Sequence, residues 1–333
     1  MKRVTIKDLA KMLNISTSTV SRALSDHPDI SRATKTRVRS VAEEFNYTTN
    51  VHAQFFRKQH SGLIALILPE INMFFTPNLI KGINKTIDHS KYSLIIFLTN
   101  NSYSKEKEVI KQCLGWAVEG VLLALAKDTY NLKHLDPLTK ADIKCVLLDK
   151  TLENETYPTV TIDSTEASFI ATSYLINKGH RNILGVFGSP NYVISQDRIK
   201  GYEKALKANN IPVMKENIIS VDKSEDLDFI LPPILNHNKQ ITALFAMSDE
   251  ILAKSMYHIN SLGLSIPEEI SIVSISDGVY PYLTHPLISH VKDSGSKMGR
   301  NACKLLLDWI DKPSKSDYSN LVVSTKLVEL GSV

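Results

Sequence analysis

Apolar residues recur at helical spacing in three short stretches within the first 47 residues, and polar turns separate these stretches. Thr5, Ser16 and Ser31 each precede one stretch and are placed to cap a helix at its N-terminus. The predicted inward positions of the three helices are Ile6, Leu9, Ala10, Leu13, Val20, Ala23, Leu24, Val38, Val41, Ala42 and Phe45. Helices this short are not stable alone, so the pattern predicts a small domain in which three helices pack together.

From Gly62 the pattern changes to short apolar runs that alternate with amphipathic stretches. The runs are typical of buried parallel strands: Leu63–Leu68, Ser93–Leu98, Val121–Leu125, Cys145–Leu148, Val160–Ile162, Ile183–Phe187, Ala243–Ala246 and Ile270–Ile275. The predicted helices between them include Lys105–Leu114, Glu166–Asn177, Gln196–Ala208 and Glu250–Leu262. This order predicts an α/β architecture with covered sheets. Roughly 270 residues of it fit two similar lobes that face each other across a cleft.

Charge is distributed unevenly along the 333 residues. Residues 1–60 contain 11 Lys and Arg against 5 Asp and Glu, whereas the rest of the chain contains 28 against 30. Positive charge is therefore concentrated in the predicted helical domain, as expected if that end neutralises DNA phosphates. Arg32, Lys35, Arg37 and Arg39 surround the third helix, and we expect a subset of them to contact phosphate.

Composition excludes several other classes of protein. Cys113, Cys145 and Cys303 are too few and too scattered for a disulfide framework or a zinc site, and they are predicted to be reduced core residues. No apolar run approaches a membrane span and no secretory leader opens the chain, so a cytoplasmic protein is expected. The sequence has no Gly-rich phosphate loop, no Gly-x-Ser-x-Gly and no His pair at metal spacing. We expect no enzyme activity, no cofactor and no metal.

The second predicted helix carries a polar face that suits DNA. Thr17, Ser18, Ser21 and Arg22 lie together on it, because positions one, four and five apart cluster on a helix. Held against the first helix, this face can enter the major groove. The polar face of an arbitrary helix would simply be solvated. Here the two capped helices, the turn between them and the flanking basic residues favour a helix-turn-helix.

The stretch TIKDLAKMLNISTSTVSRAL, which starts at Thr5, resembles the DNA-binding headpiece of the lactose-repressor (LacI/GalR) family. Later stretches resemble landmarks of the same family, so the resemblance covers the whole chain: Gly179–Gly188, Arg198–Leu206, Ala243–Ala253 and Ile266–Asp277. It implies a three-helix headpiece joined to a periplasmic-binding-protein-like core of two parallel, doubly wound subdomains. The expected parts are the headpiece at 1–47, a hinge helix at 48–61, a first lobe at 62–160 and 292–320, and a second lobe at 161–291 and 321–333.

Headpiece residues receive roles from the pattern and the resemblance together. Thr17, Ser18 and Arg22 are expected at base edges, with Arg22 the best candidate for a bidentate contact to guanine. Residues better placed for backbone contacts are Thr5, Thr19, Ser21, Ser31 and Asn50.

In the resembled family the linker forms a hinge helix on DNA and inserts a leucine into the minor groove. Asn50, Ala53 and Arg57 match that pattern, and Phe56 stands at the wedge position. Phenylalanine is an accepted intercalating wedge. The alternative is that Phe56 and its neighbour Phe55 pack on the core, since large apolar groups are normally buried.

Side chains that follow the predicted strands suggest a ligand site, because ligands in open α/β sheets bind beyond the carboxyl ends of the strands. Aromatic rings, carboxylates and an arginine there suit a polyhydroxylated molecule. The resemblance assigns effector contacts, residue by residue, to Phe74, Phe75, Asp149, Arg198, Ser248, Asp277 and Asp293. The last lies near a position often held by glutamine. Simpler interpretations are that Arg198 lies on the surface where it opens a helix, that Asp149 and Asp277 are turn residues at strand ends, and that Ser248 is only a helix cap.

Together these features predict a sequence-specific transcriptional regulator, acting as a repressor of a carbohydrate-related operon. It would bind pseudo-palindromic operator DNA as a homodimer, without the extra C-terminal helix that forms tetramers in some relatives. A sugar or sugar phosphate between the lobes would change the hinge spacing. Two alternatives are a periplasmic solute-binding protein, opposed by the basic headpiece, and a sugar-modifying α/β enzyme, opposed by the lack of a nucleophile or base constellation.

Overall fold

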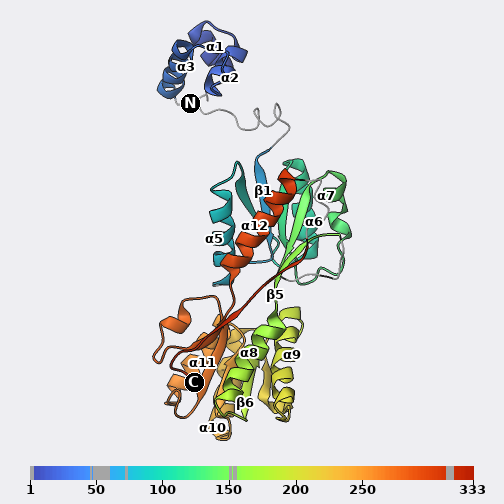
Figure 1. The fold of residues 1–333 in the computed structure, drawn as a ribbon, viewed down its shortest axis with the longest axis vertical. Coiled ribbons are helices and arrows are strands. Elements are labelled where there is room, and N and C mark those ends of the chain that lie inside the picture. Colours follow the sequence, from blue (N-terminus) through green and yellow to red (C-terminus); the bar gives the residue numbers. More distant parts are fainter. Residues whose placement is uncertain are drawn as a thin grey trace. The chain divides into compact units, whose positions relative to one another are not determined.

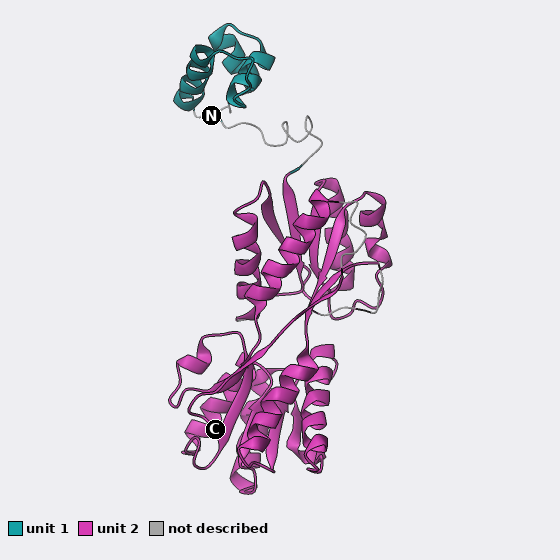
Figure 2. Ribbon diagram, in the orientation of Figure 1, with its two compact units in different colours: residues 1–61 teal, residues 62–333 magenta. Residues whose placement is uncertain are grey.

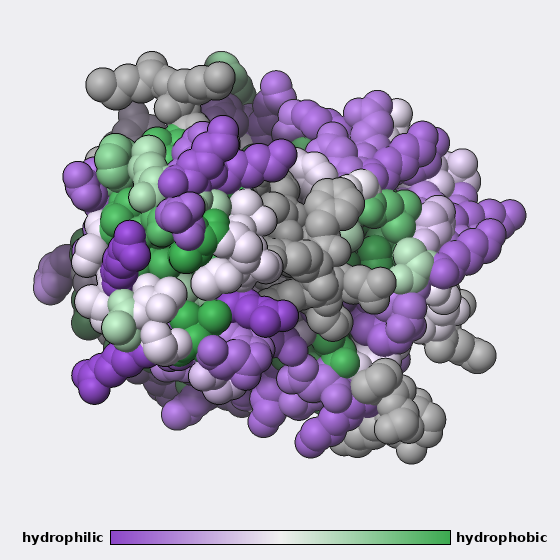
Figure 3. Space-filling view, turned by 90° about the horizontal axis from the view of Figure 1, so that it is seen from above, coloured by the Kyte–Doolittle hydropathy of each residue, from purple (hydrophilic) through white to green (hydrophobic). Residues whose placement is uncertain are grey.

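The chain folds as two units, residues 1–61 and residues 62–333 (Figure 2). The structure, a computed structural model, describes residues 4–45, 47, 61–71, 74–149, 152, 156–312 and 319–333. Among these residues, no helix is both long enough and apolar enough to cross a membrane. Hydrophilic residues predominate on the face drawn in Figure 3, and the apolar residues visible there form small separate patches.

The described residues of the first unit form three helices: α1 (Ile6–Leu13), α2 (Thr17–Leu24) and α3 (Arg32–Glu44), as Figure 1 shows. The predicted caps are confirmed, since the side chains of Thr5, Ser16 and Ser31 each accept the backbone N–H three residues further on. Asn14 ends α1 in the left-handed conformation, with φ of 53°. A left-handed residue reverses the chain there and starts the turn into α2.

The core of the first unit is small but completely enclosed. Leu9, Val20, Ala23 and Val38 are fully buried in one apolar cluster that joins the three helices. One predicted inward residue is wrong: Phe45 is the C-cap of α3 and is 41% exposed. It lies where the helix has already ended and its apolar face no longer meets the other two helices.

The second unit contains two six-stranded sheets. The first sheet is parallel throughout, with strand order β11-β5-β4-β3-β1-β2. Its strands are β1 (Leu63–Leu68), β2 (Ser93–Leu98), β3 (Gly120–Ala124), β4 (Lys144–Leu148), β5 (Thr159–Ile162) and β11 (Leu321–Val323). Its helices are α5 (Phe75–Ile87), α6 (Tyr103–Gly115), α7 (Asp136–Lys140) and α12 (Gly295–Asp311), with a short turn η1 (Lys133–Leu135). Ile64 and Leu66 pack with α5 and α12, whereas Ala65 and Ile67 pack with α6 and α7, so helices cover both faces.

The second sheet has strand order β12-β10-β9-β8-β6-β7 and is parallel except where β12 pairs with β10. Its strands are β6 (Ile183–Phe187), β7 (Ile218–Ser220), β8 (Ala243–Ala246), β9 (Ser271–Ser276), β10 (Ser289–Lys292) and β12 (Lys326–Val328). Its helical segments are α8 (Ser164–Asn177), α9 (Val193–Ala208), α10 (Leu227–His237), α11 (Asp249–Ser261), η2 (Lys215–Asn217), η3 (Ser224–Asp226) and η4 (Tyr280–Tyr282). Phe187 lies edge-on to both Phe245 and Tyr202 in the core of this lobe.

The chain passes between the two lobes three times: between β5 and α8, between β10 and α12, and between β11 and β12 (Figure 1). The predicted lobe boundaries therefore differ from those in the structure. β5 continues to Ile162, and residues 321–323, expected in the second lobe, pair with β5 in the first sheet. Residues 321–330 form one strand-like stretch in the sequence. That pattern gave no indication that its two halves pair with strands of different sheets.

All eight predicted strands are present, with bounds within one residue of those expected. The four predicted helices begin one to three residues earlier than expected. One consequence is a correction: α9 begins at Val193, so Arg198 lies in its second turn and does not open the helix. The three cysteines are buried and free, which confirms that prediction.

Candidate functional site

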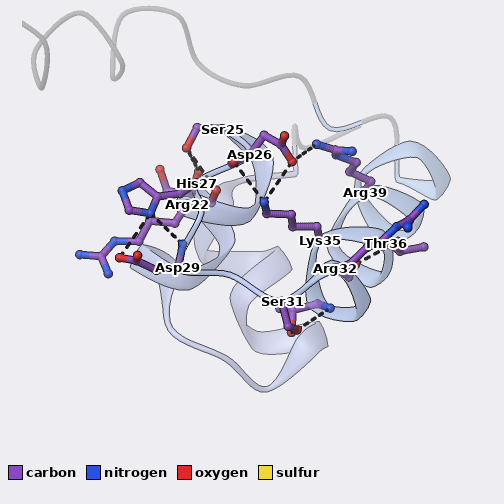
Figure 4. A network of polar contacts seen from close by, with 12 residues as sticks. Arg22, Ser25, Asp26, His27, Asp29, Ser31, Arg32, Lys35, Thr36 and Arg39 are labelled. Carbon is purple, nitrogen blue, oxygen red and sulfur yellow. Dashed lines mark hydrogen bonds and ion pairs between the residues drawn. The ribbon is translucent and has the colours of Figure 1, made fainter.

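Helix α2 presents its polar face away from the small core of the first unit. Val20 and Ala23 are buried, whereas Thr17, Ser18 and Arg22 are exposed. In Figure 4 the guanidinium of Arg22 projects away from the helices. Arginine in that position has its donors available for a base edge or a phosphate.

The hydroxyl of Ser16 organises the start of α2. Its Oγ accepts the backbone N–H of Thr19 at 3.0 Å and lies 2.7 Å from Ser18 Oγ and 2.8 Å from Thr19 Oγ1. Three of the hydroxyls at this helix N-terminus are therefore fixed before any ligand arrives. The first turn of a helix also directs its unpaired backbone N–H groups outward, which favours a phosphate.

Two other predicted backbone contacts are also helix caps. Thr5 Oγ1 donates to Asp8 Oδ2 at 2.6 Å, while Asp8 also accepts the Thr5 backbone N–H. Ser31 Oγ lies 2.9 Å from Thr34 Oγ1. Ser21 is half-buried. Thr5 and Ser31 therefore have a structural role as helix caps in the folded headpiece, whereas Ser21 lies within α2.

Asp26 connects the turn after α2 to α3 (Figure 4). Its Oδ1 accepts from Arg39 at 2.8 Å and pairs with Lys35 Nζ at 3.3 Å, and Lys35 also donates to the Asp26 carbonyl at 3.1 Å. Lys35 and then Arg39 hold the pKa of Asp26 below its usual range. Two of the four basic side chains around α3 are thus engaged within the headpiece, which leaves Arg32 and Arg37 as the exposed candidates for phosphate contact.

Four predicted DNA contacts cannot be placed. Asn50, Ala53, Phe56 and Arg57 lie outside the residues that the structure describes.

The second unit contains a cavity of about 440 Å³ between its lobes. All seven predicted effector residues line it: Phe74, Phe75, Asp149, Arg198, Ser248, Asp277 and Asp293. They come from both lobes and from segments up to 219 positions apart in the chain, which the fold brings to one place. Their contact with a ligand stays a prediction.

A buried ion pair forms one wall of the cavity. Arg198, 4% exposed, donates from one terminal nitrogen to Asp293 Oδ2 at 2.9 Å and from the other to the Met247 carbonyl. Asp293 is 7% exposed and lies where the chain crosses from β10 to α12. Burial raises the pKa of Asp293 to about 7, with Asp149 and Asp277 adding to the rise and Arg198 opposing it.

Asp277 connects the two lobes at the cavity. It follows β9 in the second lobe, yet its Oδ2 accepts the Gly295 N–H at 2.9 Å, and its carbonyl accepts from Asn78 Nδ2 at 2.7 Å. Gly295 opens α12 and Asn78 lies on α5, both in the first lobe. Burial raises the pKa of Asp277 to about 6.

Gly278, the next residue, allows the lobes to approach each other closely. A Cβ added there would lie 2.6 Å from Cδ2 of Phe74, which belongs to the first lobe. Only a residue without a side chain permits the ring of Phe74 to reach the second lobe at this point.

Helix α11 contributes two further residues. Ser248 is its N-cap, since Ser248 Oγ accepts the Ile251 N–H at 3.4 Å. The simpler interpretation of this residue is therefore confirmed, and its contact with a ligand stays a prediction. Asp249 is buried and accepts from Ser276 Oγ and, at 3.3 Å, from the Asp277 N–H. Burial raises the pKa of Asp249.

Several lining residues were missed by sequence reasoning. Glu70 follows β1, Asp222 follows β7, and Glu250 lies two residues after Ser248. The rule that ligands lie beyond strand ends could have found Glu70. Asp222 was hidden because the three-residue strand β7 is too short to give a hydrophobic run. Among the described residues, no three His, Cys, Asp or Glu side chains are arranged to hold a metal ion.

Comparison with known proteins connects both sites to described families. A family model described as "Bacterial regulatory proteins, lacI family" matches residues 5–50, and one described as "Periplasmic binding protein-like domain" matches residues 172–333. Catabolite control protein A of Priestia megaterium is 27% identical over 311 residues, which cover 93% of each chain.

Two solved structures share the fold over almost the whole chain. The lac repressor dimer bound to operator and the anti-inducer ONPF has a TM-score of 0.85 at 20% identity and covers 99% of each chain. The transcriptional regulator CelR in complex with cellobiose has a TM-score of 0.71 at 22% identity, covering 99% of this chain and 100% of that one.

Proposed function

The chain belongs to the lacI family of bacterial regulatory proteins, and from this premise we propose that it represses a carbohydrate-related operon under control of a small effector. It joins a helix-turn-helix DNA-binding domain to a periplasmic-binding-protein-like core. Regulators of this family are not enzymes, and neither a solute-binding protein alone nor a sugar-modifying enzyme is supported by the comparisons.

DNA recognition would be carried by α2. Its exposed Thr17, Ser18 and Arg22 would meet base edges in the major groove, with Arg22 donating to a guanine. Phosphates would be bound near the helix N-termini capped by Thr5, Ser16 and Ser31, where the backbone N–H groups favour an anion.

One headpiece buries too little surface for useful specificity, so the protein would act as a homodimer on a pseudo-palindromic operator in the cytoplasm. The solved lac repressor dimer on its operator, which shares the fold, supports this arrangement. The linker at 48–61 would join the headpiece to the core, with Asn50 contacting the DNA backbone and Ala53, Phe56 and Arg57 at the minor groove.

The effector would bind in the cavity between the lobes. The observation that carries this proposal is the position of Asp277, whose carboxylate lines the cavity while it accepts a hydrogen bond from the first residue of α12 across the lobe boundary. A ligand that competes for this carboxylate would change the relative angle of the lobes. That is allostery only if the two arrangements of the lobes bind the ligand with different affinity.

Selection of bound fragments from the organism's own DNA tests this function. The full-length protein would be presented with sheared genomic DNA at moderate salt, beside the Arg22→Ala variant as a matched control. Enrichment of a pseudo-palindrome by the wild type, lost or degenerate in the variant, is the expected result. The genes beside the enriched sites then define the effector class.

Uniform recovery of fragments by both proteins would contradict the proposal, because it would show binding to phosphates alone. If no fragment is recovered, the selection is repeated with pools of small molecules. Continued failure with every pool would reject sequence-specific DNA binding.

A further inference from the structure

The lining of the cavity is strongly acidic. Seven of the described residues around it carry a carboxyl group: Glu70, Asp149, Asp222, Asp249, Glu250, Asp277 and Asp293. Among the same described residues, Arg198 is the one basic side chain. A cavity with such an excess of carboxyl groups attracts positive charge and repels negative charge, and the low dielectric of its protein walls strengthens both effects.

The arginine is already engaged with the protein. Its two terminal nitrogens donate to Asp293 and to the Met247 carbonyl. Recognition of a carboxylate or phosphate by arginine normally uses two parallel donors. Within the part of the chain that the structure describes, Arg198 Nε has no hydrogen-bond partner, so it can donate to a hydroxyl oxygen, while the Asp293 carboxylate already compensates the charge of the guanidinium.

Two more buried polar atoms without a hydrogen-bond partner belong to residues that line the cavity. Within the described residues, Asp293 Oδ1 and Ser195 Oγ have none, although Asp293 is 7% exposed and Ser195 is fully buried. Both residues line the cavity. A buried carboxylate oxygen without a donor is costly, so a ligand that donates to it would be favoured.

A metal ion does not account for this arrangement, because no three suitable side chains among the described residues converge on one point. An organic ammonium group does account for it. It offers three donors and no acceptor, it carries the compensating charge, and it can lie against an aromatic face such as that of Phe74 or Tyr192.

We propose that the effector is a polyhydroxylated molecule with a protonated amine, an amino sugar, whose ammonium group binds Asp293 Oδ1 while a hydroxyl oxygen accepts from Arg198 Nε. The inference rests on the proposed effector role of this cavity. It replaces the sugar phosphate considered from the sequence, since a phosphate would enter a field of carboxylates beside a guanidinium that is already paired with Asp293.

Binding of such a ligand should depend on pH in a defined direction. Around Asp293 lie Arg198 of α9, Asp149 after β4 and Asp277 after β9, while Asp277 is also influenced by Asp249 and Lys292. Burial raises the pKa of Asp293 to about 7 and that of Asp277 to about 6, so protons compete with a cation for these oxygens below neutrality. The affinity for an amine should rise with pH through this range, whereas the affinity for an anion should fall.

Calorimetric titration of the full-length protein with matched sugars tests the proposal. Glucosamine, galactosamine and mannosamine are compared at millimolar concentration with their parent hexoses, with glucuronate and with glucose 6-phosphate. At least one amino sugar is expected to bind more tightly than its parent, with an affinity that increases with pH, and neither anion is expected to bind. Tighter binding of a parent sugar or an anion, or no binding of any amino sugar, would overturn the proposal.

Variants of the wall make the test specific. Asp293→Asn, which keeps the shape of the side chain, is expected to weaken amino-sugar binding by about tenfold. Glu250→Gln, at a half-buried position on α11, provides a second variant with less risk to folding. Asp197→Asn is the matched control, because Asp197 neighbours Arg198 on α9 but pairs with Lys200 outside the cavity.

The variants also separate two kinds of failure. If a parent hexose binds the wild type more tightly than its amino sugar does, and does not bind Arg198→Ala, the cavity stands as the effector site and the amine assignment is wrong. If an amino sugar binds the wild type, Arg198→Ala, Asp293→Asn and Glu250→Gln equally well, the ligand lies elsewhere and the proposed role of the cavity fails as well.

Discussion

The headpiece and the cavity of the core carry opposite charge. Residues 1–60 contain 11 basic and 5 acidic residues, whereas the described residues that line the cavity contribute seven carboxyl groups and one guanidinium. On the exposed headpiece, basic side chains remain hydrated until DNA replaces their counterions. In the cavity, burial opposes ionisation and raises the pKa of Asp249, Asp277 and Asp293. By the same charge argument, the headpiece is expected to bind a polyanion and the cavity a cation.

The two regions also differ in how their residues are brought together. The predicted base contacts Thr17, Ser18 and Arg22 lie on one helix of eight residues. The ion pair of Arg198 and Asp293 joins residues 95 positions apart. The headpiece site therefore depends on one small core, while the cavity depends on the packing of both lobes.

Arg198→Ala should have the largest effect on the core and should separate its function from that of the headpiece. The substitution leaves Asp293 buried without its guanidinium, which costs about 3–5 kcal/mol of unfolding free energy. Urea unfolding of the second unit measures the loss, and operator affinity should remain while the effector response disappears. Lys200→Ala, which removes only an exposed ion pair on the same helix, should cost less than about 1 kcal/mol. Equal losses for the two variants would mean that the buried pair has no special role.

Leu9→Ala should have the converse effect. Leu9 is fully buried where the three headpiece helices meet, and truncating such a leucine costs about 2–5 kcal/mol. A domain with so small a core cannot lose this much and remain folded, so operator binding should disappear. The thermal transition of the core should not move. Met12→Ala, on the exposed side of α1, is the control and should be nearly neutral. A shift of the core transition in Leu9→Ala would show that the two units unfold together.

Stability should respond to pH differently in the two regions. Because burial raises the pKa of Asp293 from 3.8 to about 7, the folded state holds a proton that the unfolded state releases. This contribution is complete below the unfolded pKa and is lost as pH rises, by about 2 kcal/mol between pH about 5 and pH about 7.

Asp293→Asn isolates this contribution from His180 and His290, whose lowered pKa values give the opposite slope. The difference in unfolding free energy between wild type and variant should change across this range. In the headpiece, Asp26 has a lowered pKa, so its contribution is lost only as pH falls below 3.8 and the headpiece should be insensitive here. If the difference in unfolding free energy between wild type and variant stays constant with pH, Asp293 is ionised throughout this range.

Arg22→Ala should have a smaller effect that is confined to DNA. Loss of a bidentate contact to guanine costs about 1–3 kcal/mol on the cognate site and relaxes preference at one base pair. Gel-shift titrations on cognate and scrambled DNA measure both quantities. Arg37→Ala, an exposed arginine of α3, is the comparison and should weaken both DNAs to the same extent. Equal loss on both DNAs for Arg22→Ala would reduce its role to a phosphate contact.

Much of the fold could be predicted because its signals are local. Each strand that formed a run of four or more apolar residues was found within one residue, and each headpiece cap was identified from the residue type before an apolar stripe. The short strand β7 and the separation of β11 from β12 could not be predicted, since their places depend on hydrogen bonds to distant strands.

By itself the sequence determined the helix-turn-helix, the caps of its helices, the α/β lobes and the residues expected at the ends of their strands. These follow from spacing and residue type over a few turns of chain, where caps, periodicity and side-chain direction act. Only the tertiary structure decided that Lys35 and Arg39 are held by Asp26, and that Arg198 is engaged by Asp293. The reason is physical: the availability of a charge depends on which groups share its surroundings and on how much water is excluded, and both depend on packing between residues far apart in the chain.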